Sequence, residues 1–225
     1  MTDGGFSWVG LLTSDIESAT SFYGELFGWE AVEGDSGGYA VFRLRGEDVA
    51  LVYEITDMQR SLGATPNWAS FVSVADVELT AARAAELGGA VAIPPYDAAR
   101  AGRIAVIQDP AGARLSLWEP RAHPGPRRTG AIGTCCWNEL ATPDLARARR
   151  FYADLFGWQV VPGDDGGARI RAAGDVQAGM HEPPKEAAGS EPTCWIPYFA
   201  AESLAGGPAA LLRDREGATF GLREA

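Results

Sequence analysis

Glu139 is the residue of this sequence best placed for acid–base chemistry. It lies in the apolar stretch Thr134 to Thr142, whose composition fits a β-strand. Because side chains alternate along a strand, Trp137 and Glu139 share one face. Desolvation on an otherwise apolar face favours the neutral carboxyl, and this tunes a general acid or base toward neutral pH. The alternative is structural: Glu139 pairs with an arginine such as Arg171 or Arg213, or faces water at a sheet edge.

The other reactive side chains form no recognised catalytic or metal-binding motif. His123 lies in a Pro/Gly-rich stretch and His181 in a His-Glu-Pro-Pro turn, so the two histidines lack the spacing of metal ligands. Cys135 and Cys136 are adjacent, and adjacent strand side chains point to opposite faces. The chain has no phosphate-binding loop and no G-x-S-x-G nucleophile turn. We therefore predict no bound metal and no cofactor.

Aromatic and polar residues on several expected strands could line a pocket for a small molecule. Ser116 and Trp118 should share one strand face. Arg103 ends a long connection rich in small residues that could form a lid, and its guanidinium could contact a ligand anion. Such surroundings suit a flat, conjugated ligand, although they also suit a plain core. The predicted ligand-binding residues are Trp8, Trp68, Arg103, Ser116, Trp118, Trp137, Trp195 and Tyr198.

The elements that must position these residues come from an internal duplication. The segment FYGELFGW, residues 22–29, recurs as FYADLFGW, residues 151–158, and Trp8 recurs as Trp137, each 129 positions later. A match of this length at one constant offset indicates two related copies of one structural unit. In each copy the sequence predicts a strand, then a helix, then three short strands. The helix starts with a capping box at Ser14 in the first copy and with an N-cap hydroxyl at Thr142 in the second.

The second copy is shorter than the first. Trp68 recurs as Trp195 after 127 positions, but Asp109 recurs as Asp214 after only 105, so 22 residues are missing between these anchors. In the first copy this stretch holds an expected helix after Asp76. We predict an α+β fold of tandem β-α-β-β-β modules, with domains at 1–120 and 133–225, a linker at 121–132, and one helix absent from the second domain.

The repeated signature resembles the first helix of the vicinal oxygen chelate superfamily, which includes glyoxalase I, bleomycin-resistance proteins and extradiol dioxygenases. The resemblance rests on W-x-x-x-x-T-x-D-x-x-x-A-x-x-FY-x-x-LFGW in both copies and on DP-x-G-A near the end of the first. It covers nearly the whole chain and is greatest to the subgroup with two fused domains. It implies two glyoxalase-like domains, in which the signature aromatics are core residues rather than catalytic ones.

The same resemblance argues against the superfamily's metal chemistry. Metal-dependent members carry His, Gln or Glu at positions that this chain fills with other residues, which cannot ligate a cation well. These residues are Trp8, Ala69 and Ser116 in the first copy, Trp137 and Gly221 in the second, with Leu51 or Gly179 near the remaining position.

Composition narrows the classes of partner. The 19 basic and 30 acidic residues give a formal net charge of −11, so the chain should repel nucleic acid and anionic membranes. The start of the sequence lacks a basic, apolar signal, so we expect a cytoplasmic protein, as a monomer or homodimer.

We expect this protein to bind a small, aromatic or polyketide-like molecule without a metal, as in antibiotic biosynthesis or resistance. The alternative is a tailoring enzyme of secondary metabolism, an isomerase, cyclase or cofactor-independent oxygenase or hydroxylase that uses Glu139 as acid or base. The sequence leaves open whether the protein is an enzyme.

Overall fold

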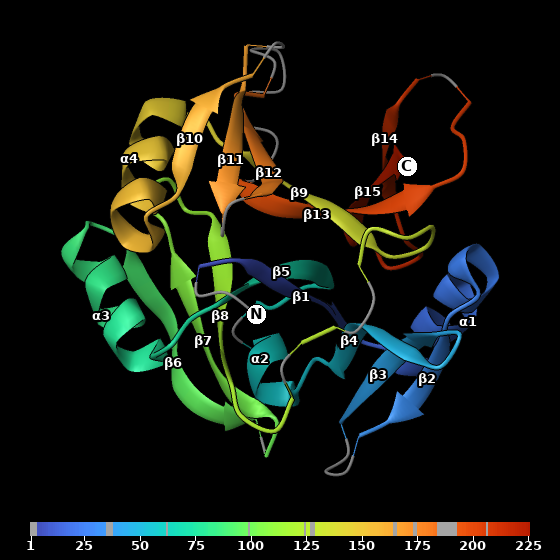
Figure 1. The fold of residues 1–225 in the computed structure, drawn as a ribbon. Helices are drawn as coiled ribbons and strands as arrows, with labels where there is room; N and C mark the ends of the chain where they lie inside the picture. Colours follow the sequence, from blue (N-terminus) through green and yellow to red (C-terminus); the bar gives the residue numbers. More distant parts are fainter. Residues whose placement is uncertain are drawn as a thin grey trace. The chain divides into compact units, whose positions relative to one another are not determined.

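The structure is a computed structural model, drawn in Figure 1. It describes residues 4–34, 38–61, 63–98, 100–123, 125–126, 129–163, 166–172, 175–183, 193–205 and 207–225. The chain divides into two compact units. Unit 1 comprises residues 1–7, 70–125 and 137–196, and unit 2 comprises residues 8–69, 126–136 and 197–225.

The described residues of unit 1 form two helices and two groups of hydrogen-bonded strands. One group has the order β5-β8-β7-β6 and the other has the order β10-β11-β12-β9. The elements are β5 (Asn67–Ser73), α3 (Val77–Glu86), β6 (Ala90–Ala98), β7 (Gly102–Gln108), β8 (Arg114–Pro120), β9 (Cys135–Ala141), α4 (Leu145–Phe156), β10 (Gln159–Pro162), β11 (Ala168–Ala172) and β12 (Asp175–His181). The bounds of β5 and β9 include a few residues of unit 2.

Unit 2 repeats this plan with fewer elements. Its strands have the orders β2-β3-β4-β1 and β13-β15-β14. The elements are β1 (Phe6–Thr13), α1 (Ile16–Phe27), β2 (Glu30–Glu33), β3 (Tyr39–Leu44), β4 (Glu47–Glu54), α2 (Asp57–Ser61), β13 (Cys194–Ala201), β14 (Ala209–Arg213) and β15 (Thr219–Glu224). The bounds of β1 and β13 include a few residues of unit 1, Trp195 among them.

Each unit combines the first half of one sequence copy with the second half of the other. Unit 2 contains α1 of the first copy and β15 of the second, whereas unit 1 contains α4 of the second copy and β8 of the first. The predicted domains, 1–120 and 133–225, follow the two sequence copies and therefore do not coincide with the compact units. This domain assignment stays a prediction. Residues 124, 127 and 128 of the predicted linker lie outside the described residues.

The fold confirms the predicted α+β class and the helix missing from the second copy. The first copy passes from β5 through α3 and β6 to β7, whereas the second passes from β13 to β14 with no helix in described residues 202–205 and 207–208. Among the described residues, no helix combines the length and apolar character needed to cross a membrane.

The two repeated helices begin and end alike. The Asp15 carboxylate accepts a hydrogen bond from the Ser18 amide at 2.9 Å, and Asp144 does the same for the Arg147 amide. The predictions of a cap at Ser14 and at Thr142 were therefore wrong by one and two residues. At Ser14 the physical reason is that its hydroxyl is already bonded to the Glu216 carboxylate. Both helices end at a glycine of positive φ, 73° at Gly28 and 70° at Gly157.

The signature aromatics form the cores of the two units, as predicted. Tyr23 and Tyr152 are fully buried, and each ring lies within 6 Å of its signature tryptophan, at 5.6 Å from Trp29 and 5.5 Å from Trp158. Each of these indoles donates to a backbone carbonyl of its own unit, Trp29 at 2.8 Å and Trp158 at 2.6 Å. Buried indole N–H groups need such acceptors, so each bond ties the chain that follows a repeated helix to another segment of the same unit.

Candidate functional site

Two predicted ligand-binding tryptophans belong to buried hydrogen-bond networks. In unit 2, the Trp68 indole N–H donates to the Tyr23 hydroxyl at 2.8 Å, and this hydroxyl donates to Asp214 Oδ2 at 2.9 Å. In unit 1, Trp195 donates to Tyr152 at 2.9 Å, and Tyr152 donates to Asp109 at 3.1 Å. Trp68 is 5% exposed and Trp195 is 3% exposed, so both occupy core positions in which a ligand contact remains only a prediction.

These two networks give a structural role to the tyrosine and the aspartate that recur in both sequence copies. Oδ1 of Asp214 accepts from the amides of Glu216 and Ala218, which fixes the turn before β15, while Oδ2 receives the Tyr23 hydroxyl. Desolvation by burial, followed by the nearby Asp214 charge, raises the pKa of Tyr23 far above its ordinary value. The hydroxyl therefore stays protonated as a donor, and its role is structural.

Three other predicted ligand residues lie in or near the core. Ser116 of β8 is 4% exposed and pairs in register with Phe71 of β5. Trp118, on the same strand, is 2% exposed, and its ring lies so close to Gly102 that a Cβ there would approach it to 2.7 Å. Trp8 in unit 2 is 2% exposed.

Two further predicted residues have partners within their own units. The Arg103 guanidinium forms ion pairs with Glu78 at 2.6 Å and with Asp97 at 3.3 Å, so two carboxylates already occupy the position predicted for a ligand anion. The Tyr198 ring lies against Gly221, where any side chain would collide with it. The roles of both residues in ligand binding stay predictions.

Glu139 lies at the centre of a polar cluster on one face of unit 1. The Trp137 indole N–H donates to Glu139 Oε2 at 2.5 Å, and His181 Nδ1 lies 3.2 Å from Glu139 Oε1. The Arg169 guanidinium lies over the Trp137 ring, 5.6 Å from its centroid. Strand alternation thus placed Trp137 and Glu139 together correctly, but the partner of Glu139 among the described contacts is His181 and not an arginine.

Strand register builds this cluster. In the parallel pairing of β12 with β9, Gly179 lies opposite Glu139, and on its other side Gly179 lies opposite Arg169 of β11. A Cβ at position 179 would approach Glu139 Oε2 to 2.5 Å, so the glycine leaves room for the carboxylate in its present position. His181 lies two residues further along β12 and therefore projects from the same face.

The Glu139–His181 pair has the geometry of an acid–base site. The Glu139 side chain is 14% exposed and that of His181 is 39% exposed, so solvent or a ligand can reach the pair. A carboxylate that binds one nitrogen of an imidazole fixes its tautomer and orientation. Sequence reasoning had assigned His181 to a surface turn, because nothing in the sequence shows that β12 pairs with β9.

The side chains at the superfamily's metal positions do not fit a divalent cation. An indole at Trp8 or Trp137 offers no lone pair, and Leu51, Gly179 and Gly221 have no donor side chain. Ser116 supplies a single buried hydroxyl. Within the described residues, no group of three or more His, Cys, Asp or Glu side chains could hold a metal ion.

Residues 5–117 match the family model of the Glyoxalase/Bleomycin resistance protein/Dioxygenase superfamily. CFP32 of Mycobacterium tuberculosis, which bears the provisional name of glyoxylase, is 35% identical over 208 residues, covering 87% of this chain and 77% of that protein. The anthracycline biosynthesis protein DauV of Streptomyces sp. strain C5 is 32% identical over 173 residues, covering 71% of this chain and 62% of DauV.

Solved structures show the same fold at lower identity. The Mn(II)-bound glyoxalase from Novosphingobium aromaticivorans superposes with a TM-score of 0.68 at 16% identity, over 99% of this chain and 82% of that chain. The 2,3-dioxygenase LapB from Pseudomonas sp. KL28 gives a TM-score of 0.66 at 16% identity, over 100% and 94%.

Proposed function

Because the chain belongs to the Glyoxalase/Bleomycin resistance protein/Dioxygenase superfamily, we propose that it binds a small aromatic, polyketide-like molecule without a metal ion. The relatives named for anthracycline biosynthesis support this ligand class, since anthracyclines are polycyclic aromatic compounds. The absence of His, Gln and Glu from the superfamily's metal positions supports metal independence. A role in antibiotic biosynthesis or resistance agrees with this ligand class and with metal-independent binding.

The observation that carries the proposal is the accessible Glu139–His181 pair beside Trp137. Polycyclic aromatic polyketides carry phenol and keto groups, which exchange hydrogen bonds with a carboxylate and an imidazole. The charge-assisted bond to a carboxylate is roughly twice as strong as one between neutral groups. In this function, Glu139 accepts from a ligand hydroxyl, while the Trp137 indole N–H holds the carboxylate and Gly179 leaves room for it.

The same pair favours a second candidate function, a redox-neutral tailoring reaction such as an isomerisation. Glu139 would take a proton from the carbon between the carbonyl and the double bond of a β,γ-unsaturated substrate, and the proton would return to the γ-carbon of the resulting dienolate. One C–H bond breaks and one forms, so no oxidant or cofactor is needed. His181, whose Nδ1 lies 3.2 Å from Glu139 Oε1, would position the Glu139 carboxylate.

A binding and turnover experiment separates these functions. Hydroxylated anthraquinones would be titrated against the wild type and Glu139→Gln by tryptophan fluorescence, and incubated mixtures would be analysed for products by mass spectrometry. Glu182→Gln, which changes the exposed carboxylate of the residue that follows His181 in the chain, is the matched control. We expect Glu139→Gln to weaken binding several-fold while Glu182→Gln does not.

Turnover by the wild type that disappears in Glu139→Gln, with binding retained, would support the tailoring enzyme. Tight binding without any product would support the binding protein. Equal affinity and equal turnover in wild type and Glu139→Gln would refute a role for this site. A stoichiometric metal ion found by elemental analysis, after purification without added metal, would refute metal independence.

A further inference from the structure

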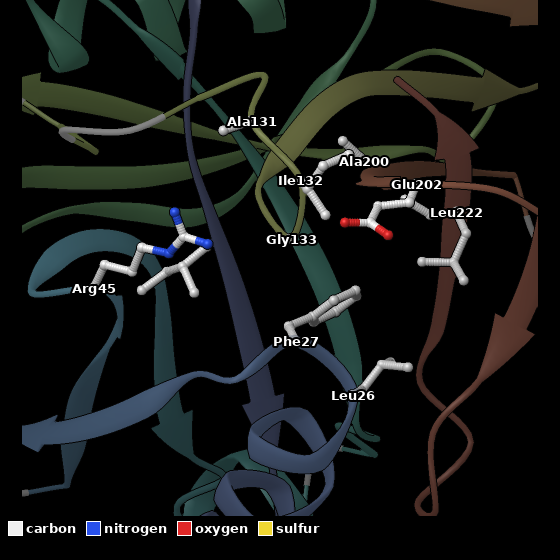
Figure 2. A pocket seen from close by; sticks show the side chains of 11 residues that line it. Leu26, Phe27, Arg45, Ala131, Ile132, Gly133, Ala200, Glu202 and Leu222 are labelled. Atoms are coloured by element: carbon white, nitrogen blue, oxygen red, sulfur yellow. The ribbon is translucent and has the colours of Figure 1, made fainter.

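Unit 2 contains a hollow that the proposed function does not use. It has a volume of about 510 Å³, within the range of small-molecule sites. Apolar side chains from the end of α1, the end of β3, residues 131–133 and β15 line most of it. Figure 2 shows Leu26 and Phe27 on one side and Ile132 opposite, with Arg45 and Glu202 at either side.

The hollow lies where the second copy lacks a helix. In unit 1, α3 buries Val77, Ala81 and Ala84 and packs against α4 and β8. There Leu117 of β8 is fully buried, whereas Leu222, its counterpart in β15, lines the hollow and is only partly buried. Without a counterpart of α3, unit 2 therefore leaves apolar surface uncovered.

The exposure of Leu26 and Ile132 shows how apolar this uncovered surface is. The two residues are 40% and 43% exposed. Leu155, the counterpart of Leu26 in unit 1, packs partly buried against that unit's core. Burial of such a surface by a ligand is favourable, at roughly 25 cal/mol for each Å² of apolar area removed from water.

Opposite charges stand at the two sides of this hollow. The Arg45 guanidinium and the Glu202 carboxylate both turn toward its space in Figure 2. Both residues are exposed, and within the described residues neither side chain makes an ion pair or hydrogen bond. One cation and one anion thus flank an apolar surface without neutralising each other.

The backbone of Arg45 is held in an unfavourable conformation. Arg45 has a φ of 54° and precedes Gly46, with a φ of 80°, in the two-residue turn between β3 and β4. Turns of this kind prefer Asn, Asp or Gly at both positions, because other residues strain in the left-handed region. A guanidinium at this point of the turn therefore costs stability that Asn would not.

We propose that this hollow binds a small zwitterionic molecule with a rigid apolar body. Its anionic group faces Arg45, its ammonium group faces Glu202, and its body covers Phe27, Leu26 and Ile132. A molecule with one charge, or with none, leaves one or both side chains without a partner. This site shares no residue with the Glu139 cluster, so the result of its test is independent of the result for the proposed function.

Three biphenyl probes test the proposal by calorimetric titration and by NMR. The first carries a carboxylate at one end and an aminomethyl group at the other, and the second and third each keep only one of these charges. We expect the zwitterionic probe to bind most tightly, by about two- to fivefold for each charge that meets its partner at this exposed site. Equal affinities for the three probes would overturn the charge assignment.

Variants locate the binding. Arg45→Asn should remove the preference for the carboxylate while leaving the protein as stable as the wild type or more so, since Asn tolerates the turn. Glu202→Gln should remove the preference for the ammonium group. Arg114→Gln and Glu30→Gln, which change exposed charges elsewhere, are the matched controls.

Filling the hollow distinguishes it from other sites on the molecule. Ile132→Trp places a large side chain in the hollow and should abolish binding of all three probes, with far-ultraviolet circular dichroism confirming the fold. Undiminished binding to Ile132→Trp, or unchanged preferences in both charge variants, would refute the site.

Discussion

Removal of the Tyr23 hydroxyl should destabilise the protein strongly. In Tyr23→Phe, the Trp68 indole N–H, now 2.8 Å from an acceptor, becomes a buried donor with no partner. Asp214 loses a donor at 2.9 Å but keeps its backbone donors. A neutral hydrogen bond contributes about 1 kcal/mol and one to a charged group about 1.5–3 kcal/mol. We therefore expect a loss of about 2–4 kcal/mol, a large share of the 5–15 kcal/mol typical of folded proteins.

Urea unfolding monitored by tryptophan fluorescence measures this loss. Tyr39→Phe is the matched control, because it also removes a tyrosine hydroxyl, but one that makes no hydrogen bond within the described residues. We expect it to cost less than about 0.5 kcal/mol. Tyr152→Phe should repeat the large effect in unit 1, where the hydroxyl is bonded to Asp109 and Trp195. Equal midpoints for Tyr23→Phe and Tyr39→Phe, at an unchanged denaturant slope, would refute the reasoning.

Two further predictions concern single side chains. Glu216→Gln should cost about 1–2 kcal/mol at neutral pH, because the hydroxyls of Thr13 and Ser14 both donate to the Glu216 carboxylate. Although burial raises it, these bonds lower the folded-state pKa of Glu216 below its ordinary value of 4.5. In urea titrations the wild type should therefore be more stable than Glu216→Gln above pH 4.5, and this stability difference should disappear as the pH falls through the folded-state pKa. Gly179→Ala should cost about 1 kcal/mol by thermal unfolding, because the added Cβ displaces the end of the Glu139 side chain, and an equal cost in a Glu139→Ala background would contradict this explanation.

Much of the architecture could be predicted because it depends on local patterns repeated in the sequence. The spacing of Tyr23 and Phe27 along the helix, and the glycine at position 28, specify a helix with one apolar face and a fixed end. The missing stretch of the second copy predicted a missing helix for the same reason. The N-cap was misplaced because Ser14 and Asp15 are equally good caps locally, and only the distant Glu216 decides between them.

The candidate site was only half predictable. Alternation along one strand places Trp137 and Glu139 on one face, since this needs no knowledge of neighbouring strands. His181 lies 42 residues from Glu139, and the strand register that brings it there is set by long-range pairing. For the same reason, the two carboxylates that hold Arg103 could not be predicted from its position in a connection.

The crossing of the sequence copies between units has a consequence for synthesis of the chain. The bond between Tyr23 and Asp214 joins residues 191 positions apart, and Phe220 of β15 is fully buried in the same core. Chains leave the ribosome at about 5–20 residues per second, and contacts distant in sequence form slowly. Helix α1 must therefore wait for β15 before its core is complete, whereas unit 1 can complete its core once residue 196 has been made. A truncation just before Phe220 would remove part of the core of unit 2 and leave every residue of unit 1 in place.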